Sequence, residues 1–184
     1  MRKASLAALS VLALTMCLTS TAHARRRSFS SGSNYVSNGH FGAGLELGGP
    51  SGLNAKLFLT PSTALDFGLG WFYDNYYRDG SGLQLYVDHL WHPSSLTDQP
   101  AFKLPWFIGV GVNFWSFDDR NDKTNDRYGG IGVRVPIGLA FDFNDIPLDA
   151  FVELTPTFDL FYGGYRDHAG LLLEASIGAR FWFD

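Results

Sequence analysis

The sequence predicts an all-β protein, an eight-stranded antiparallel transmembrane up-and-down β-barrel with an N-terminal signal peptide. Large hydrocarbon side chains alternate with glycine or polar residues from about residue 40 onward, which is the period-2 pattern of strands. The alternating segments are about ten residues long, enough for a tilted strand to cross a bilayer. The chain of 184 residues also contains 21 glycines and 16% aromatic residues, an unusual composition for a soluble domain.

The N-terminus has the pattern of a secretory signal peptide. Arg2 and Lys3 precede an apolar run, and Ala22-His23-Ala24 supplies a small-x-small cleavage site. We therefore expect a signal peptide at residues 1–24. Residues 25–39 are rich in Ser, Gly, Asn and Arg, which predicts a flexible leader, and residues 40–184 form the barrel domain.

Eight strands are expected within the barrel domain. The stretch "GGIGVRVPIGLAFDF", residues 129–143, shows the alternation most clearly. Pro136 and Pro156 lie inside two of the expected strands and lack a ladder donor, so we expect a bulge there. The predicted strands cover residues 40–48, 52–59, 63–73, 82–92, 104–115, 130–143, 147–160 and 170–183.

The two faces of these strands differ in chemistry. A soluble, lipocalin-like barrel would place the charged face in water, but that face is also rich in glycine. Glycines opposite bulky rings suit a narrow interior, so the polar face is expected inside and the hydrocarbon face against lipid. In this arrangement Arg134 and Glu153 are neighbours. The predicted interior polar network consists of Glu46, Lys56, Asp66, Asp88, Arg134, Asp142, Glu153, Glu174 and Arg180.

Aromatic residues on the hydrocarbon face gather near the strand ends. Two aromatic girdles around an aliphatic band are typical of outer-membrane barrels, as are long outer loops and short periplasmic turns. We therefore expect export to the outer membrane of a Gram-negative bacterium. The predicted interface aromatics are Trp71, Trp91, Trp106, Phe114, Phe143, Phe181 and Phe183.

Charge and cysteine content limit the expected partners. Loss of Arg2 and Lys3 would leave acidic residues in excess by six, which argues against nucleic acid as a partner. Cys17 is the single cysteine and lies in the signal, so no disulfide is expected. The expected partners are outer-membrane lipid and lipopolysaccharide, the barrel-insertion machinery, and extracellular proteins that contact loops 116–129 and 162–169.

No sequence motif predicts catalysis, a metal or a cofactor. The acidic loop "DDRNDKTND" lacks the spacing of an EF-hand, and His89 and His92 precede Ser94 and Ser95 without triad spacing. Eight-stranded barrels are just wide enough for side chains to fill. We expect a non-enzymatic barrel with a structural or surface-interaction role through its loops. Two alternatives stay open, a narrow ion-conducting pore and a lipid-modifying enzyme.

Three segments also carry a family resemblance. They are "GGPSGLNAKLFLTPSTALDFGLGW", "YVDHLWH" and "GVRVPIGLAFDFNDIPLDAFVELTPTFDL", and the most specific pattern runs from Gly132 to Glu153. From about Phe41 to Phe183 the chain resembles an uncharacterised family of small bacterial outer-membrane β-barrels, a domain of unknown function with OmpA-like or OmpX-like architecture. The resemblance implies the barrel fold and the membrane, and it carries no catalytic residues to this chain.

Overall fold

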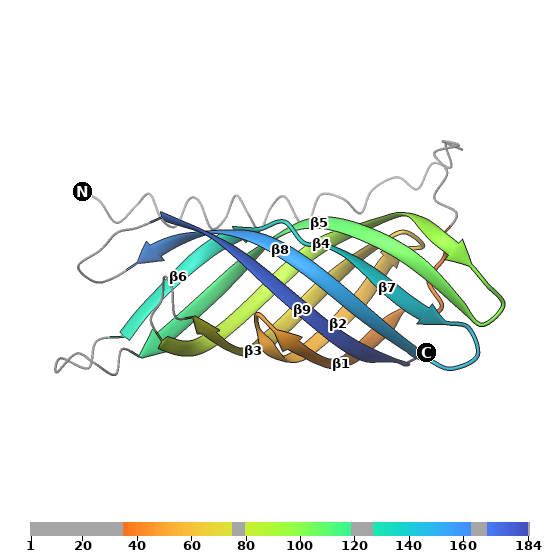
Figure 1. Cartoon of the computed structure of the whole chain (residues 1–184), viewed down its shortest axis with the longest axis horizontal. Coiled ribbons are helices and arrows are strands. Elements are labelled where there is room, and N and C mark those ends of the chain that lie inside the picture. Colours follow the sequence, from red (N-terminus) through yellow and green to blue (C-terminus); the bar gives the residue numbers. More distant parts are fainter. Residues whose placement is uncertain (1–34, 75–79, 119–126, 163–168, 184) are drawn as a thin grey trace. The chain divides into compact units, whose positions relative to one another are not determined.

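The alternating segments form antiparallel strands that close into a ring (Figure 1). The computed structural model describes residues 35–74, 80–118, 127–162 and 169–183, and the expected signal peptide lies outside these ranges. The predicted all-β, eight-stranded antiparallel barrel is confirmed. Its strands are β1 (Phe41–Gly48), β2 (Ser51–Thr60), β3 (Thr63–Asp74), β4 (Gly80–Asp98), β5 (Phe102–Asp118), β6 (Arg127–Arg134), β7 (Ile137–Phe143), β8 (Leu148–Tyr162) and β9 (Ala169–Phe183).

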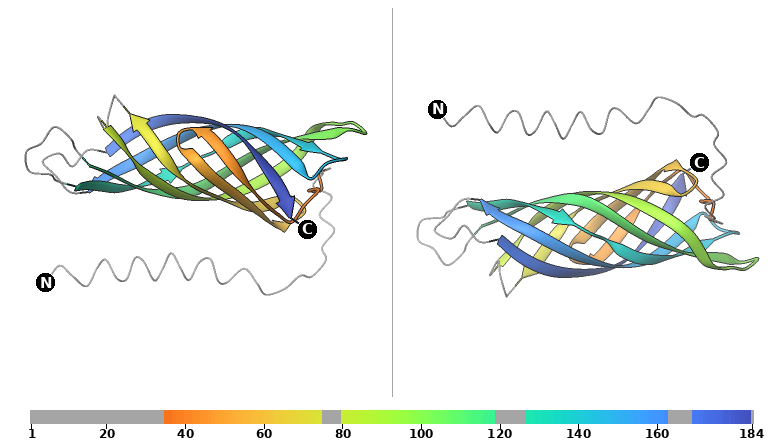
Figure 2. Two further views of the ribbon diagram at one scale, coloured as in Figure 1. Left: turned by 90° about the horizontal axis from the view of Figure 1, so that it is seen from below. Right: turned by 90° about the horizontal axis from the view of Figure 1, so that it is seen from above.

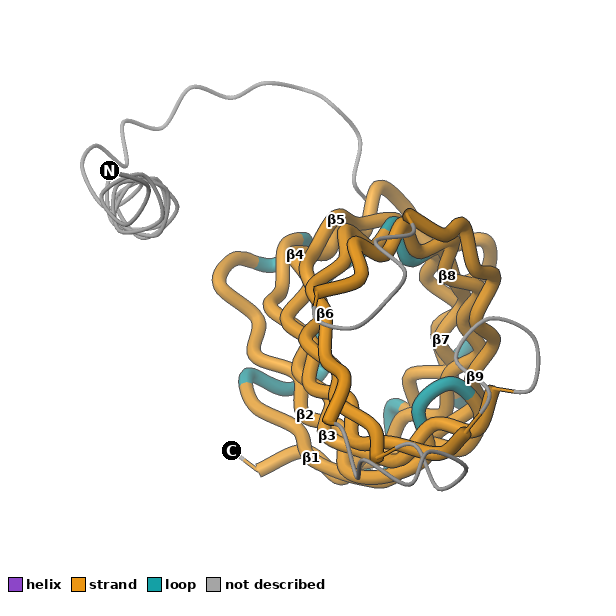
Figure 3. Tube along the Cα trace, turned by 90° about the vertical axis from the view of Figure 1, so that its left-hand side faces the viewer, coloured by secondary structure: helices purple, strands orange, loops and turns teal. Residues whose placement is uncertain are grey.

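Each strand pairs with its neighbour in the sequence, and β9 returns to pair with β1. Phe41 lies opposite Phe183 in that closing pair, and the register runs through to Gly48 opposite Ser176. Figure 3 shows the resulting ring along its axis. Because the sheet closes on itself, it leaves no free edge for another chain to join.

β6 and β7 are two halves of one barrel strand. Arg134 pairs with Gly111 of β5 and Thr157 of β8, whereas Ile137 pairs with Ile108 and Leu154 of the same two strands. The interrupted strand and its two partners, β5 and β8, each span three residues between these pairs. No strand therefore has an extra residue at the interruption. The bulge predicted at the two prolines is thus wrong. The missing donor of Pro136 interrupts the ladder without shifting the register.

The β4–β5 hairpin is longer than the sequence predicted. The expected strands ended at residue 92 and began at residue 104, but pairing continues to Asp98 opposite Lys103. Register shifts between Trp91 and Ser94, and between Ser95 and Asp98, accommodate the irregular sequence "HPSSLTDQP". In Figure 2 this hairpin projects beyond the other turns at the same end of the barrel.

The two ends of the barrel have connections of different length. Residues 61–62, 99–101 and 144–147 join strands at one end, here called the turn end. Residues 49–50, 75–79, 119–126 and 163–168 join strands at the other end, the loop end. The last three lie outside the described residues, so much of the predicted loops 116–129 and 162–169 does as well. At the short β1–β2 turn, Gly48 adopts a φ of +133°, which favours glycine.

Apolar side chains cover the outside of the barrel. Leu47, Leu171 and Leu173 are 67%, 68% and 70% exposed, and valines, isoleucines and leucines of the other strands form a continuous band with them. The charged side chains alternate with this band and are buried inside. No helix within the described ranges is long and apolar enough to cross a membrane.

Glycines facing aromatic rings make room inside the narrow barrel. Gly68 lies opposite Tyr86 in the β3–β4 ladder, and Gly178 lies opposite Phe151 in the β8–β9 ladder. A Cβ atom built at either glycine would overlap the facing ring. The interior is therefore packed by pairing residues of opposite size, which is why the polar face is rich in glycine.

Replacement of Gly68 by alanine tests this size pairing. The added methyl would overlap Tyr86 and approach Glu46 Oε1 to 2.7 Å, so we expect Gly68→Ala to destabilise the barrel by about 1–3 kcal/mol. Urea unfolding in detergent micelles measures the change. At the control position, Gly129→Ala, the added carbon meets a backbone oxygen at 3.0 Å and no ring, so a smaller loss is expected. Equal losses at the two positions would contradict the size pairing.

Candidate functional site: the charged barrel interior

The structure places the nine predicted interior residues inside the barrel. Eight of them are at most 5% exposed, and the Glu174 side chain is 9% exposed. They come from eight of the nine strands, all except β5, because alternate residues of each strand point inward. They gather in three groups, around Arg134, around Arg180, and at the turn end near Lys56 and Asp142.

Arg134 links three carboxylates across the centre of the barrel. Its Nε donates to Asp88 Oδ2 at 3.2 Å, its Nη1 to Glu174 Oε2 at 3.0 Å and its Nη2 to Glu153 Oε1 at 3.3 Å. These acids belong to β4, β9 and β8, so one guanidinium joins four strands. The Arg134 guanidinium also lies 3.9 Å from the centre of the Tyr86 ring, a cation–π contact. A planar guanidinium with five fixed donors suits a site in which three acids lie around one cation.

Hydroxyl and amide groups complete this central group. Thr155 Oγ1 donates to Glu153 Oε1 at 2.6 Å, and Gln84 Nε2 donates to Glu174 Oε2 at 3.2 Å. Each of these bonds goes to the same carboxylate oxygen that accepts from Arg134, since such an oxygen can accept more than one hydrogen bond. A buried carboxylate needs such partners because it has lost its contact with water.

Tyr86 and Asn54 connect the central group to the Arg180 group. The Tyr86 hydroxyl donates to Glu46 Oε2 at 2.8 Å and accepts from Asn54 Nδ2 at 2.8 Å. Asn54 Nδ2 also donates to Asp66 Oδ1 at 3.3 Å. Asn54 is absent from the predicted network, although it alternates with Lys56 on the inward face of β2. The period-2 pattern alone was sufficient to find it.

Arg180 repeats the arrangement closer to the turn end. Its Nη2 donates to Asp149 Oδ2 at 2.9 Å, and its Nη1 donates to Asp66 Oδ1 at 3.2 Å and to Asn54 Oδ1 at 3.1 Å. The guanidinium lies 4.2 Å from the centre of the Phe151 ring. Arg180 and Asp149 face each other directly in the β8–β9 ladder, so the strand register itself brings this pair together.

Lys56 lies in aromatic surroundings at the turn end. Its Nζ is 3.2 Å from His92 Nε2 and 4.7 Å from the centre of the Phe107 ring. A lysine ammonium has no acceptor, so Lys56 donates to the histidine nitrogen. His92 is 1% exposed and points into the barrel.

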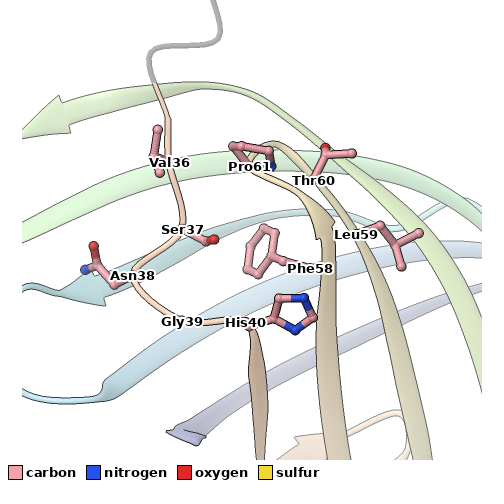
Figure 4. Close-up of a pocket in the computed structure, with 9 residues that line it drawn as sticks. All are labelled: Val36, Ser37, Asn38, Gly39, His40, Phe58, Leu59, Thr60 and Pro61. Atoms are coloured by element: carbon pink, nitrogen blue, oxygen red, sulfur yellow. The ribbon is translucent and has the colours of Figure 1, made fainter. Parts of the chain in front are cut away.

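Residues 35–40, here called the leader segment, pack against this end of the barrel (Figure 4). Tyr35 is 3% exposed, and its hydroxyl donates to Asp142 Oδ2 at 3.0 Å. Burial, with Asp142 nearby, raises the pKa of the Tyr35 hydroxyl, so it stays protonated and able to donate. Residues 35–39, the described part of the expected leader 25–39, thus make defined contacts with the barrel, which the alternation pattern did not reach.

The residues considered for hydrolysis have other partners. Ser94 Oγ accepts from Trp106 Nε1 at 3.0 Å, and Ser95 Oγ accepts from the Leu104 amide at 3.1 Å. The His92 ring stacks on Tyr35 with a centroid separation of 5.4 Å. Among the described residues, no group of histidine, cysteine and carboxylate side chains is arranged to hold a metal ion.

The predicted interface aromatics stand on the outer surface near the two ends. Trp71 and Phe114 lie toward the loop end and are 68% and 49% exposed. At the turn end, Phe183 and Phe181 are exposed with ring centres 5.2 Å apart. Three others lie in the turn-end halves of β4, β5 and β7, namely Trp91, Trp106 and Phe143.

The described part of the interior is acidic overall. Its described acids outnumber its bases, which favours cations over anions wherever water enters. The bases are Lys56, Arg134 and Arg180, and the acids are Glu46, Asp66, Asp88, Asp142, Asp149, Glu153 and Glu174. Side chains from opposite walls meet at the centre, as in small barrels whose interiors are filled.

These features define a class, the small antiparallel β-barrels whose interior is filled by a polar network. The chain belongs to the family described as Protein of unknown function (DUF3996), which matches residues 33–181. This confirms the expected membership of an uncharacterised family. No curated protein matches the chain significantly.

A solved structure has a similar fold. The crystal structure of the N-terminal β-barrel domain of Pseudomonas aeruginosa OprF matches with a TM-score of 0.55 and 18% sequence identity. The match covers 77% of this chain and 93% of that domain. At this identity the similarity supports the barrel fold.

Removal of the Arg134 charge tests the central group. Arg134→Gln leaves three buried carboxylates without their cation, so we expect a loss of about 3–5 kcal/mol in the free energy of unfolding. The double variant Arg134→Gln/Glu174→Gln should recover part of that loss. Urea unfolding in micelles measures both. Lys103→Gln removes a more accessible charge and should cost about 1 kcal/mol or less. If Arg134→Gln matches the wild type, the group does not stabilise the barrel.

Proposed function

We propose that the chain is an outer-membrane β-barrel with a structural or surface-interaction role. The observation that carries this proposal is the inside-out distribution of side chains, with buried charges and a continuous exposed apolar band. Soluble monomers rarely expose apolar patches of more than a few hundred Å². A bilayer removes that cost, and the OprF barrel domain supports the same class of protein.

The filled interior supports a non-enzymatic role that lies at the surface. Arg134 and its three acids occupy the centre, and Tyr35 occupies the turn end. Interaction would then take place through loops 116–129 and 162–169, with lipopolysaccharide or extracellular proteins as partners. The signal peptide, the insertion machinery and the Gram-negative outer membrane belong to the same proposal. The buried position of His92 does not favour the lipid-modifying alternative.

The alternative of a narrow pore is favoured by the excess of interior acids, which would make it cation-selective. Planar-bilayer recording on the refolded protein separates the two functions. We expect a band that shifts on boiling in gel electrophoresis and no stable channels. Reproducible cation-selective channels that change in Arg134→Gln would establish the pore instead. Absence of a heat-modifiable band would contradict a membrane barrel altogether.

An arginine at the centre of the outer face tests membrane insertion directly. Val135 is 42% exposed and lies at the middle of the β6–β7 strand. In lipid vesicles, Val135→Arg should destabilise the barrel by about 2–4 kcal/mol, because the charge would lie near the bilayer midplane. Leu59→Arg, at the turn end of β2, should cost about 0–1 kcal/mol. Equal, small effects at both positions would place the apolar band in water.

A further inference from the structure

The leader segment crosses the opening at the turn end of the barrel. It continues into β1 at Phe41, yet Tyr35 reaches Asp142 on β7, which is separated from β1 by β9 and β8. On its way it bonds to β2, where the Phe58 amide donates to the His40 carbonyl at 2.8 Å. Tyr35 also stacks on His92 of β4, so the segment contacts β2, β4 and β7 and lies over the opening between them.

Tyr35 is enclosed by rings from three different strands. Its ring centre is 5.4 Å from that of His92 on β4 and 6.1 Å from that of Phe58 on β2. Trp182 of β9 belongs to the same buried cluster, together with Ala64 of β3. We call Phe58, His92 and Trp182 the mouth cage. Asp142 stands at its polar edge and accepts the Tyr35 hydroxyl bond.

A separate set of hydrogen bonds holds the leader segment in place. The Asn38 amide nitrogen Nδ2 donates to the Phe143 carbonyl and to Asn144 Oδ1, both at 3.0 Å. Lys103 Nζ donates to Asn38 Oδ1 at 2.9 Å and to the Val36 carbonyl at 3.0 Å. Both functional groups of the Asn38 amide are therefore bonded, one to the β7–β8 turn and the other to the β4–β5 hairpin.

We propose that the mouth cage is a binding site for a phenol side chain, filled by the chain's own Tyr35, and that the leader segment thereby seals the turn end. An aromatic cage with a carboxylate acceptor at its edge matches a tyrosine, which has an aromatic ring and one donor. Behind Tyr35 lies the Lys56–His92 pair, which the seal separates from water. This inference depends on the fold alone and goes beyond the proposed surface role.

A cysteine behind the seal measures whether it closes. Ala64 is fully buried beside Tyr35, and cysteine adds little volume there. We suggest Ala64→Cys in a full chain that also carries Cys17→Ser, folded in micelles and exposed to a charged maleimide. Slow labelling is expected with the natural leader. In the Tyr35→Ala background the cysteine should label at least about tenfold faster. Tenfold corresponds to a loss of about 1.4 kcal/mol in the free energy that keeps the leader segment closed.

Matched control variants distinguish loss of the Tyr35 seal from a general loss of barrel stability. Val36→Ala changes a neighbouring residue that is 56% exposed and should leave the labelling rate unchanged. Leu96→Cys, 61% exposed on the β4–β5 hairpin, should label rapidly with or without Tyr35. The gel shift on boiling shows that each variant is folded. If Tyr35→Ala does not fold, Asn38→Ala removes the hydrogen bonds but keeps the cage, and faster labelling is expected there too.

Added phenols test the chemical class of the site. In Tyr35→Ala, p-cresol should restore slow labelling of the Ala64→Cys cysteine, and toluene should do so less well because it cannot donate to Asp142. Fast labelling with the natural leader, or equally slow labelling in Tyr35→Ala, would overturn the seal. Failure of p-cresol to protect would overturn the assignment as a phenol site. None of these readouts depends on conductance, so they are independent of the proposed function.

Discussion

The interior of this barrel depends on the guanidinium of Arg134. Closure of the ring takes several carboxylates away from water, and each would cost several kcal/mol if it had no partner. Arg134 compensates three of them with three separate nitrogen atoms, and its flat face still packs on Tyr86. Arg180 does the same for Asp66 and Asp149. Both positions need a rigid group with several donors, a requirement that lysine does not meet.

Packing around these two arginines follows from the narrow cross-section of the barrel. Each guanidinium stacks on an aromatic ring, Arg134 on Tyr86 and Arg180 on Phe151. Each of those rings in turn lies over a glycine of the neighbouring strand. Charge, ring and glycine thus form a repeated unit across the wall. The same residues balance the buried charges and fill the interior. A substitution that alters the charge balance therefore alters the packing as well.

The two ends of the barrel differ in the length of their connections and in what covers them. At the turn end, connections are short, aromatic rings enclose Tyr35, and the leader segment bonds to both the β4–β5 hairpin and the β7–β8 turn. At the loop end, longer connections lie beyond the strands. A filled interior and a covered turn end leave the loop end as the place where a surface role would be exercised. Under the proposed function, the barrel would serve as a rigid support for those loops.

The sequence by itself determined the number of barrel strands, the alternation of side chains between the two faces and most of the interior charges. These follow from period-2 alternation, which every residue of a strand must obey. The sequence predicted that Arg134 and Glu153 are neighbours, which is confirmed, but only the tertiary structure decided that Asp88 and Glu174 bind the same guanidinium. Arg134 and Glu153 bond at 3.3 Å although their Cα partners across the ladder are Thr157 and Gly138, because long side chains reach across the lumen between rungs.

The leader and the two corrections to the strands have the same physical origin. Tyr35 lies outside any alternating segment, so no periodic signal could place it in the cage. Pro136 removes one ladder donor, but its neighbours on both sides keep the register, and local sequence could not reveal that support. The β4–β5 hairpin likewise extends through irregular sequence because pairing tolerates bulges. Alternation is a property of one strand, whereas contacts across the lumen exist only once the ring has closed.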